Sequence, residues 1–93
     1  MINNHFSFTG VVVRLYTEHH FENNLQIFEI EIEMQDCKTV ILPVLYGEFT
    51  KGTEELKRGD KILVEGAIDL IEKKVSCVAS YISNLSRYAR KNK

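Results

Sequence analysis

The chain has 93 residues, of which 44% are hydrophobic and 27% are charged, and its formal net charge is −1. This length allows one domain with a modest core and excludes a second domain. No apolar run approaches the roughly 18 residues that a membrane span requires, and Met1 to His5 carries no basic cluster, so we expect a cytoplasmic protein without membrane contact.

The charges are unevenly distributed along the chain. Met1 to Tyr46 holds two basic residues against six acidic ones, a net −4, whereas Gly47 to Lys93 holds ten against seven, a net +3. The last eight residues, SRYARKNK, carry four basic residues and no acidic one. A polyanion would therefore meet the C-terminal half first. We expect residues 1–86 to form the domain and residues 87–93 to form a basic tail.

The first predicted strand is HFSFTGVVVRLY, from His5 to Tyr16, because it is rich in β-branched and aromatic residues. Gly10 lies inside it, where we expect a bulge or a sharp coil of the strand. The following TEHHFENN has no apolar period and ends in two asparagines, which tolerate left-handed backbone conformations, so it is predicted as a loop.

The segment LQIFEIEIEMQ alternates with a period of two and predicts a second strand. Its apolar row consists of Phe28, Ile30, Ile32 and Met34, and its acidic row consists of Glu29, Glu31 and Glu33. We expect the apolar row to fill the core and the acidic row to project outward.

After a turn at Asp36 to Lys38, TVILPVLYG predicts a third strand that is apolar on both faces. Pro43 cannot donate a backbone hydrogen bond, so the strand is interrupted or lies at an edge there. We assign Val40, Leu42 and Val44 to the outer face, where an exposed apolar row indicates an interface, such as a contact between subunits.

A short charged segment then joins two apolar strands. Thr53 suits the N-cap of a helix, acidic residues follow it, and Gly59 suits the left-handed position after the last turn, so one or two helical turns are predicted. DKILVEGAIDLI, with Gly66 at its middle, and VSCVASYISNL are predicted as the last two strands, with a tight hairpin at EKK.

This order of elements, three strands, a short helix and two strands, is typical of the five-stranded OB-fold barrel. Glycines near the middle of the first and fourth strands fit the coiling that a small barrel needs. The predicted fold class is therefore all-β. An SH3-like barrel is the main alternative, but it normally lacks a helix at that place.

The stretch VLYGEFTKGTEELKRGDKILVEGAIDL resembles the bacterial single-stranded DNA-binding protein family, including members like primosomal replication protein B. FTGVVVRL resembles the first strand of that family, and the similarity is thin outside the middle of the chain. The resemblance implies a homodimer or homotetramer that holds single-stranded DNA on its sheet face and loops. It places Tyr46 at a stacking position of the third strand, and Arg14 where the family often has an arginine.

Three features depart from the family. The chain has no tryptophan, and Val40 stands where a stacking aromatic is expected. The hairpin between the last two strands is short, and a basic end replaces a long tail with an acidic tip. These differences fit a reduced or accessory member.

Binding an unpaired strand without reading its sequence requires flat aromatic faces for the bases and cations for the phosphates. The candidate binding residues are Tyr46, Arg14, Tyr16, Lys51, Lys73, Lys74, Arg87, Arg90 and Lys91. Tyr81 and Phe49 are further aromatic candidates, although for these two and for Tyr16 the sequence favours a structural role. RNA is an alternative ligand, because stacking tolerates any base.

The acidic row of the second strand opposes this function, because carboxylates repel phosphates. Either the DNA path is displaced toward the basic loops and tail, or binding is weak. The leading hypothesis is a sequence-nonspecific single-stranded DNA-binding protein in replication, recombination or repair. The alternative is a protein-interaction module of a replication or repair assembly, with little affinity for nucleic acid.

We expect no enzyme and no cofactor, because the sequence has no Gly-rich phosphate loop and no nucleophile motif. We also expect no metal site: Cys37 and Cys77 match no CxxC pattern and are predicted as free core thiols, and the adjacent His19 and His20 are predicted as solvated side chains.

Overall fold

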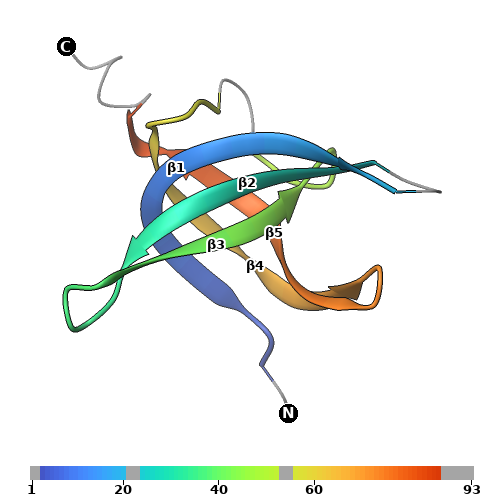
Figure 1. Ribbon diagram of the computed structural model, residues 1–93, viewed down its shortest axis with the longest axis horizontal. Coiled ribbons are helices and arrows are strands. Elements are labelled where there is room, and N and C mark those ends of the chain that lie inside the picture. Colours follow the sequence, from blue (N-terminus) through green and yellow to red (C-terminus); the bar gives the residue numbers. More distant parts are fainter. Residues whose placement is uncertain (1–2, 21–23, 53–55, 87–93) are drawn as a thin grey trace.

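Five strands form a closed barrel in the order β1-β2-β3-β5-β4 (Figure 1). The computed structural model describes residues 3–20, 24–52 and 56–86. The strands are β1 (Phe6–His19), β2 (Asn24–Glu33), β3 (Thr39–Tyr46), β4 (Lys61–Ile71) and β5 (Lys74–Asn84). The predicted all-β, five-stranded OB-fold barrel is confirmed.

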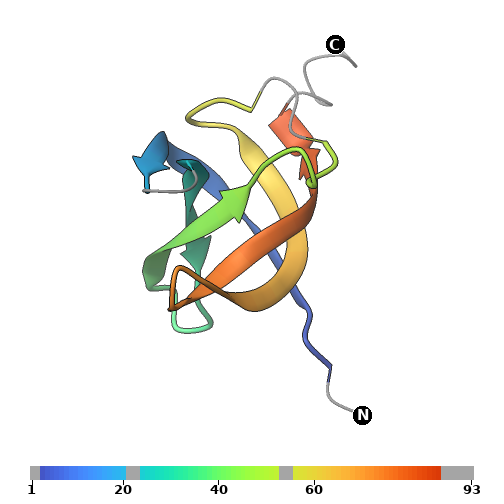
Figure 2. The same cartoon turned by 90° about the vertical axis from the view of Figure 1, so that its right-hand side faces the viewer.

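Strand β1 pairs with two other strands of the barrel, one along each part of its length. Phe6 to Val11 pairs with β4, and Val11 to His19 pairs with β2, both antiparallel. The barrel closes where β3 and β5 run parallel, and this seam pairs Val44 with Cys77 and Leu45 with Val78. Figure 2, turned by 90°, shows the strands coiling around the enclosed interior.

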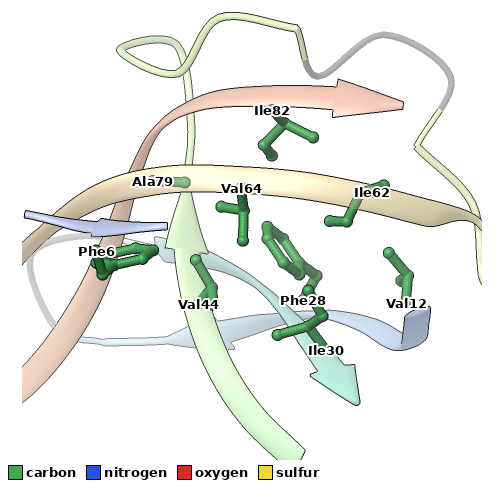
Figure 3. Packing of buried hydrophobic residues seen from close by; sticks show 9 residues of the cluster. All are labelled: Phe6, Val12, Phe28, Ile30, Val44, Ile62, Val64, Ala79 and Ile82. Atoms are coloured by element: carbon green, nitrogen blue, oxygen red, sulfur yellow. The ribbon is translucent and has the colours of Figure 1, made fainter. Parts of the chain in front are cut away.

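The interior is filled by buried apolar side chains from all five strands (Figure 3). Within the described part of the chain, this core consists of Phe6, Val12, Phe28, Ile30, Val44, Ile62, Val64, Ala79 and Ile82. Phe28 and Ile30 are fully buried, which confirms the predicted inward row of β2. Met34, at the far end of that row, is exposed.

The prediction of which row of β3 lies on the outer face is wrong. Val44 is fully buried and Leu42 packs against the core, so the row assigned to the outside points inward. The reason is the register, in which Val44 pairs with Phe28 and Leu42 pairs with Ile30, and directly paired residues share a face. Because both rows of this strand are apolar, alternation alone cannot choose between them. The outer row consists of Ile41, Pro43 and Leu45.

Two glycines let strands approach one another closely. A Cβ at Gly10 would overlap the carbonyl oxygen of Glu31 on β2, and a Cβ at Gly66 would overlap that of Val78 on β5. Gly66 also lies at a shift of register between β4 and β5, as expected for a coiled strand. In β1 the shift of register lies beyond Gly10, after Val12.

Hydrogen bonds of a buried threonine hold the connection between β3 and β4 in place. Thr50 donates a hydrogen bond from Oγ1 to the carbonyl oxygen of Ala79 on β5 (2.7 Å) and accepts one from the Gly47 amide (3.1 Å). Its own amide donates to the Gly47 carbonyl (2.9 Å). The next residue, Lys51, forms a parallel bridge with Tyr81. The connection is therefore held against β5.

The helix predicted between β3 and β4 is not confirmed. Its first residues, 53–55, lie outside the described residues, and Arg58 and Gly59 form a turn closed by a hydrogen bond from the Asp60 amide to the Lys57 carbonyl (3.1 Å). Gly59 has a φ of 93°, the left-handed conformation expected of it. Within the described residues, no helix is long and apolar enough to cross a membrane.

We expect Thr50→Val to lower the free energy of unfolding by about 1–3 kcal/mol, because it leaves the Ala79 carbonyl without its donor. Urea unfolding measures this loss. Thr50→Ser keeps the hydroxyl and should lose much less. Identical unfolding midpoints for Thr50→Val and the natural chain would contradict the role given to this hydroxyl.

Candidate functional site

A groove crosses the outside of the barrel between two hairpins. Figure 1 shows the β1–β2 and β4–β5 hairpins on the same side of the barrel, the side toward which β3 runs. The groove has a volume of about 280 Å³. Its floor consists of Leu25, Ile27, Pro43 and Leu45, and its walls include Tyr16, Glu18 and His20 on one side and Glu72, Lys74 and Val75 on the other. We call it the β2–β3 groove.

The floor of this groove is an apolar row that runs across three strands. Tyr16, Ile27 and Leu45 are paired in succession from β1 to β3 and share the outer face. Ile27 and Leu45 are buried even though they point away from the interior. This row therefore forms a second, smaller apolar layer outside the barrel, and the accessible apolar side chains next to it in the groove are Leu25 and Pro43.

The outer face of β2 changes from apolar to acidic beyond the groove. Leu25 and Ile27 line it, and Glu29, Glu31 and Glu33 continue the same face toward the β2–β3 turn. The predicted outward acidic row is confirmed. None of its three carboxylates lines the β2–β3 groove, so the face is divided into an apolar half and an acidic half.

Arg14 and Tyr16 form a pair beside the groove. The Arg14 guanidinium carbon lies 4.4 Å from the centroid of the Tyr16 ring, within the range of a cation–π contact. An Arg14 nitrogen lies 4.0 Å from a carboxylate oxygen of Glu29, and 63% of the arginine side chain is exposed. Burial raises the pKa of Tyr16, Glu29 adds to the rise and Arg14 opposes it. The site thus presents a neutral aromatic ring covered by an exposed, planar cation.

The remaining charges of the groove are mixed in sign. Lys74 contributes a positive charge at the start of β5, while Glu18 and Glu72 contribute negative ones. A carboxylate oxygen of Glu18 lies 2.6 Å from Nε2 of His20. Attraction for a polyanion at this groove therefore depends on few cations rather than on a broad basic surface.

The β4–β5 hairpin is the predicted tight turn. Glu72 and Lys73 occupy its two central positions with φ of 51° and 65°, the left-handed conformation of a two-residue hairpin. Lys74 follows the turn and lines the groove, whereas Lys73 does not. Of these two candidate binding residues, Lys74 therefore lies in the wall of the groove and Lys73 at the tip of the hairpin.

Tyr46 does not lie on the outer face with the floor residues. It packs against the core with its ring centroid 5.4 Å from that of Phe28, at an interplanar angle of 51°. Burial raises its pKa. Its exposed part lines a second groove, of about 640 Å³, at the end of β3, together with Phe49 and residues of the β1–β2 hairpin. We call this the β3-end groove.

The structure brings together three of the residues that the sequence singled out: Arg14, Tyr16 and Lys74. Lys51 lies in the β3–β4 connection and lines neither groove. Arg87, Arg90 and Lys91 lie outside the described residues.

The floor residues were missed by the sequence analysis. Pro43 and Leu45 lie outside because of the pairing of β3 with β2, which no local pattern of β3 reveals. The available signal was the alternation of β2 itself: the face of its glutamates also carries Leu25 and Ile27, two apolar residues at the other end of the strand.

The prediction of two core thiols is wrong for Cys37, which is exposed in the β2–β3 turn. Cys77 is partly buried against the core, and burial raises the pKa of its thiol. Within the described ranges, no three His, Cys, Asp or Glu side chains gather as metal ligands would.

No family model and no curated protein match the sequence. The structure is similar to the dimeric N-terminal domain of PriB from Thermoanaerobacter tencongensis, with a TM-score of 0.72, 19% identity, and coverage of 90% of this chain and 98% of that one. The second single-stranded DNA-binding protein of Mycobacterium smegmatis gives a TM-score of 0.66 at 17% identity, covering 96% and 93%. Mitochondrial single-stranded DNA-binding protein Rim1 from S. cerevisiae gives 0.71 at 17% identity, covering 92% and 97%. At the level of the fold, these similarities confirm the resemblance seen in the sequence.

Proposed function

We propose that this protein binds single-stranded DNA without sequence preference, and that the β2–β3 groove is its binding site. The observation that carries the proposal is the Arg14–Tyr16 pair beside an apolar groove. In OB folds, the face of strands two and three and the two flanking loops bind oligonucleotides, and this groove occupies that position. The similar solved structures, which include single-stranded DNA-binding proteins, support the same ligand.

Each part of the groove makes a different contact with the bound strand. The Tyr16 ring and the planar Arg14 guanidinium are surfaces on which unpaired bases stack, and each stacked base contributes about 1–3 kcal/mol. Leu25 and Pro43, the accessible part of the apolar floor, accept the base faces that water would otherwise cover. Lys74 and the charge of Arg14 meet the phosphates. The activity proposed is binding without catalysis.

The acidic half of the face limits where the strand can lie. A phosphate at contact distance from one carboxylate costs about 1 kcal/mol in water, and less when salt screens it. Three carboxylates in a row would offset one stacked base. The proposed path therefore stays on the apolar half, and Arg14, which is paired with Glu29, lies at the border between the two halves.

Titration of a fluorescent dT oligonucleotide at several salt concentrations tests the proposal. With Arg14 and Lys74 as the phosphate contacts of the groove, the logarithm of the binding constant should fall with that of salt, by about 0.7 for each contact. Lys74→Ala should reduce this slope by about 0.7. Lys73→Ala, at the tip of the same hairpin, is the matched control.

No binding at low salt, or an affinity that salt leaves unchanged, would overturn the proposal. Competition with rU and duplex DNA in the same titration shows whether RNA is bound as well. Duplex DNA should compete poorly, because its bases are already stacked and paired.

We extend the proposal to the assembly and to the cellular process. We propose that the chain acts as a homodimer or homotetramer in DNA replication, recombination or repair. The PriB domain similar to it is described as dimeric. We also propose Lys51 and the tail residues Arg87, Arg90 and Lys91 as further phosphate contacts. Light scattering of the purified protein tests the assembly.

A second candidate function is a protein-interaction module of a replication or repair assembly. The acidic row of β2 favours it, because Glu31 is paired with Ile41, an apolar residue that is 53% exposed. Such a surface suits a basic and partly apolar protein partner. This function predicts a stable complex with a protein partner and negligible affinity for dT.

A further inference from the structure

We infer that Phe49 is a base-stacking residue, and that a bound strand runs from the β2–β3 groove over the end of β3 onto its ring. The inference rests on the proposed function and adds a direction and a second stacking surface to it. Its ligand is an unpaired base of the same DNA strand.

The exposure and position of Phe49 point to a ligand. Phe49 is 61% exposed, and it belongs neither to the core nor to the residues packed against the core. The ring lies against the backbone of Gly47, where an added Cβ would be only 3.1 Å from a ring carbon. A flat aromatic surface is therefore held in place at the end of β3 while remaining open to solvent.

The two grooves form one path. Leu25, Leu45 and Ile71 line both the β2–β3 groove and the β3-end groove. A strand stacked at Tyr16 can therefore continue past Leu45 to Phe49 without leaving the surface of these grooves.

Charge determines the direction in which the strand leaves the β2–β3 groove. Toward the β2–β3 turn it would meet Glu29, Glu31 and Glu33 in succession. Among the described residues that line the β3-end groove, the one charged side chain is Glu48. A polyanion is thus repelled less along the end of β3 than along the outer face of β2.

The β3-end groove also suits a single base. Gln26 and Thr17 line it together with Phe49 and offer donors and acceptors to the edge of a base. The Watson–Crick edge of a base is free in a single strand and occupied in a duplex. The groove therefore favours single strands over duplexes at a second point along the path.

The test measures binding of a dT oligonucleotide of about 16 nucleotides, the upper site size of one OB fold. Phe49→Ala should weaken binding about tenfold, the loss of one stacked base. Phe49→Leu keeps an apolar side chain but no aromatic face, and it should weaken binding nearly as much. Tyr81→Ala removes another exposed aromatic, 44% exposed, that lines neither groove, and should leave affinity unchanged.

Photo-cross-linking of the natural chain to an oligonucleotide that contains 5-iododeoxyuridine gives a second readout. A cross-link to Phe49 supports the inference. If the natural chain binds dT and both Phe49 variants bind equally well, or if cross-links form elsewhere and not at Phe49, the inference is wrong and the proposed function stands. If the natural chain does not bind dT at all, the proposed function is wrong, and the inference is wrong with it.

Discussion

Tyr16→Ala should weaken the binding of single-stranded DNA by about tenfold or more, because it removes the ring on which a base stacks beside the groove. The same change releases Arg14, whose guanidinium lies 4.4 Å from the ring centroid and would lose its fixed orientation. Fluorescence anisotropy with a dT oligonucleotide at low salt measures the loss.

Two variants separate the possible causes of this loss. Tyr16→Phe keeps the ring and should bind nearly as well as the natural chain, which distinguishes stacking from a hydrogen bond of the phenol. Arg14→Lys keeps the charge but removes the planar guanidinium, so it should lose affinity while keeping the salt dependence. Because Tyr16 neighbours Ile27 on the outer face, the stability of Tyr16→Ala must be measured in parallel. Unchanged affinity of a folded Tyr16→Ala would contradict the assignment of this site.

Phe28→Ala should lower the free energy of unfolding by about 3–5 kcal/mol, which is the usual cost of removing a buried phenylalanine. Phe28 is fully buried among side chains from several strands (Figure 3). Small domains have only about 5–15 kcal/mol of stability in total, so the variant should be close to unfolding at room temperature. Thermal and urea unfolding measure the change.

Ile82→Val is the control for this prediction, because it removes one methyl group from the same core and should cost only about 0.5–1.5 kcal/mol. Phe28→Ala also removes the ring against which Tyr46 packs. If Phe28→Ala lost no more stability than Ile82→Val, the central place of Phe28 in the core would be wrong.

The sequence predicted the fold well where one face of a strand is apolar and the other polar. The alternation of Phe28 and Ile30 with the glutamates determined the orientation of β2, and the structure confirms it. On β3 both rows are apolar, so the local pattern could not identify the inward one. Pairing with β2 decides it, and pairing between strands is not visible in a single strand's sequence.

The candidate site was predictable only in part, for the same reason. Arg14 and Tyr16 are two residues apart on β1 and therefore share a face, so their proximity follows from the sequence. That Tyr16 lines the same groove as Lys74 and Leu45 depends on how the barrel closes. Phe49 follows the last residue of β3 by three positions, and its place in the β3-end groove depends on the path of the connection that Thr50 holds.

Within the named strands, the parallel contact between β3 and β5 joins two pairs of residues, fewer than any other junction of the barrel, and the Lys51–Tyr81 bridge extends it beyond the end of β3. Such a junction is where a closed sheet separates most easily, at a lower free energy than complete unfolding. Pro43 and Leu45 line the β2–β3 groove from one side of it, and Ser76 and Cys77 from the other. A ligand in that groove would contact both strands of this junction and stabilise their pairing. We therefore expect the barrel to become more rigid when the ligand is bound.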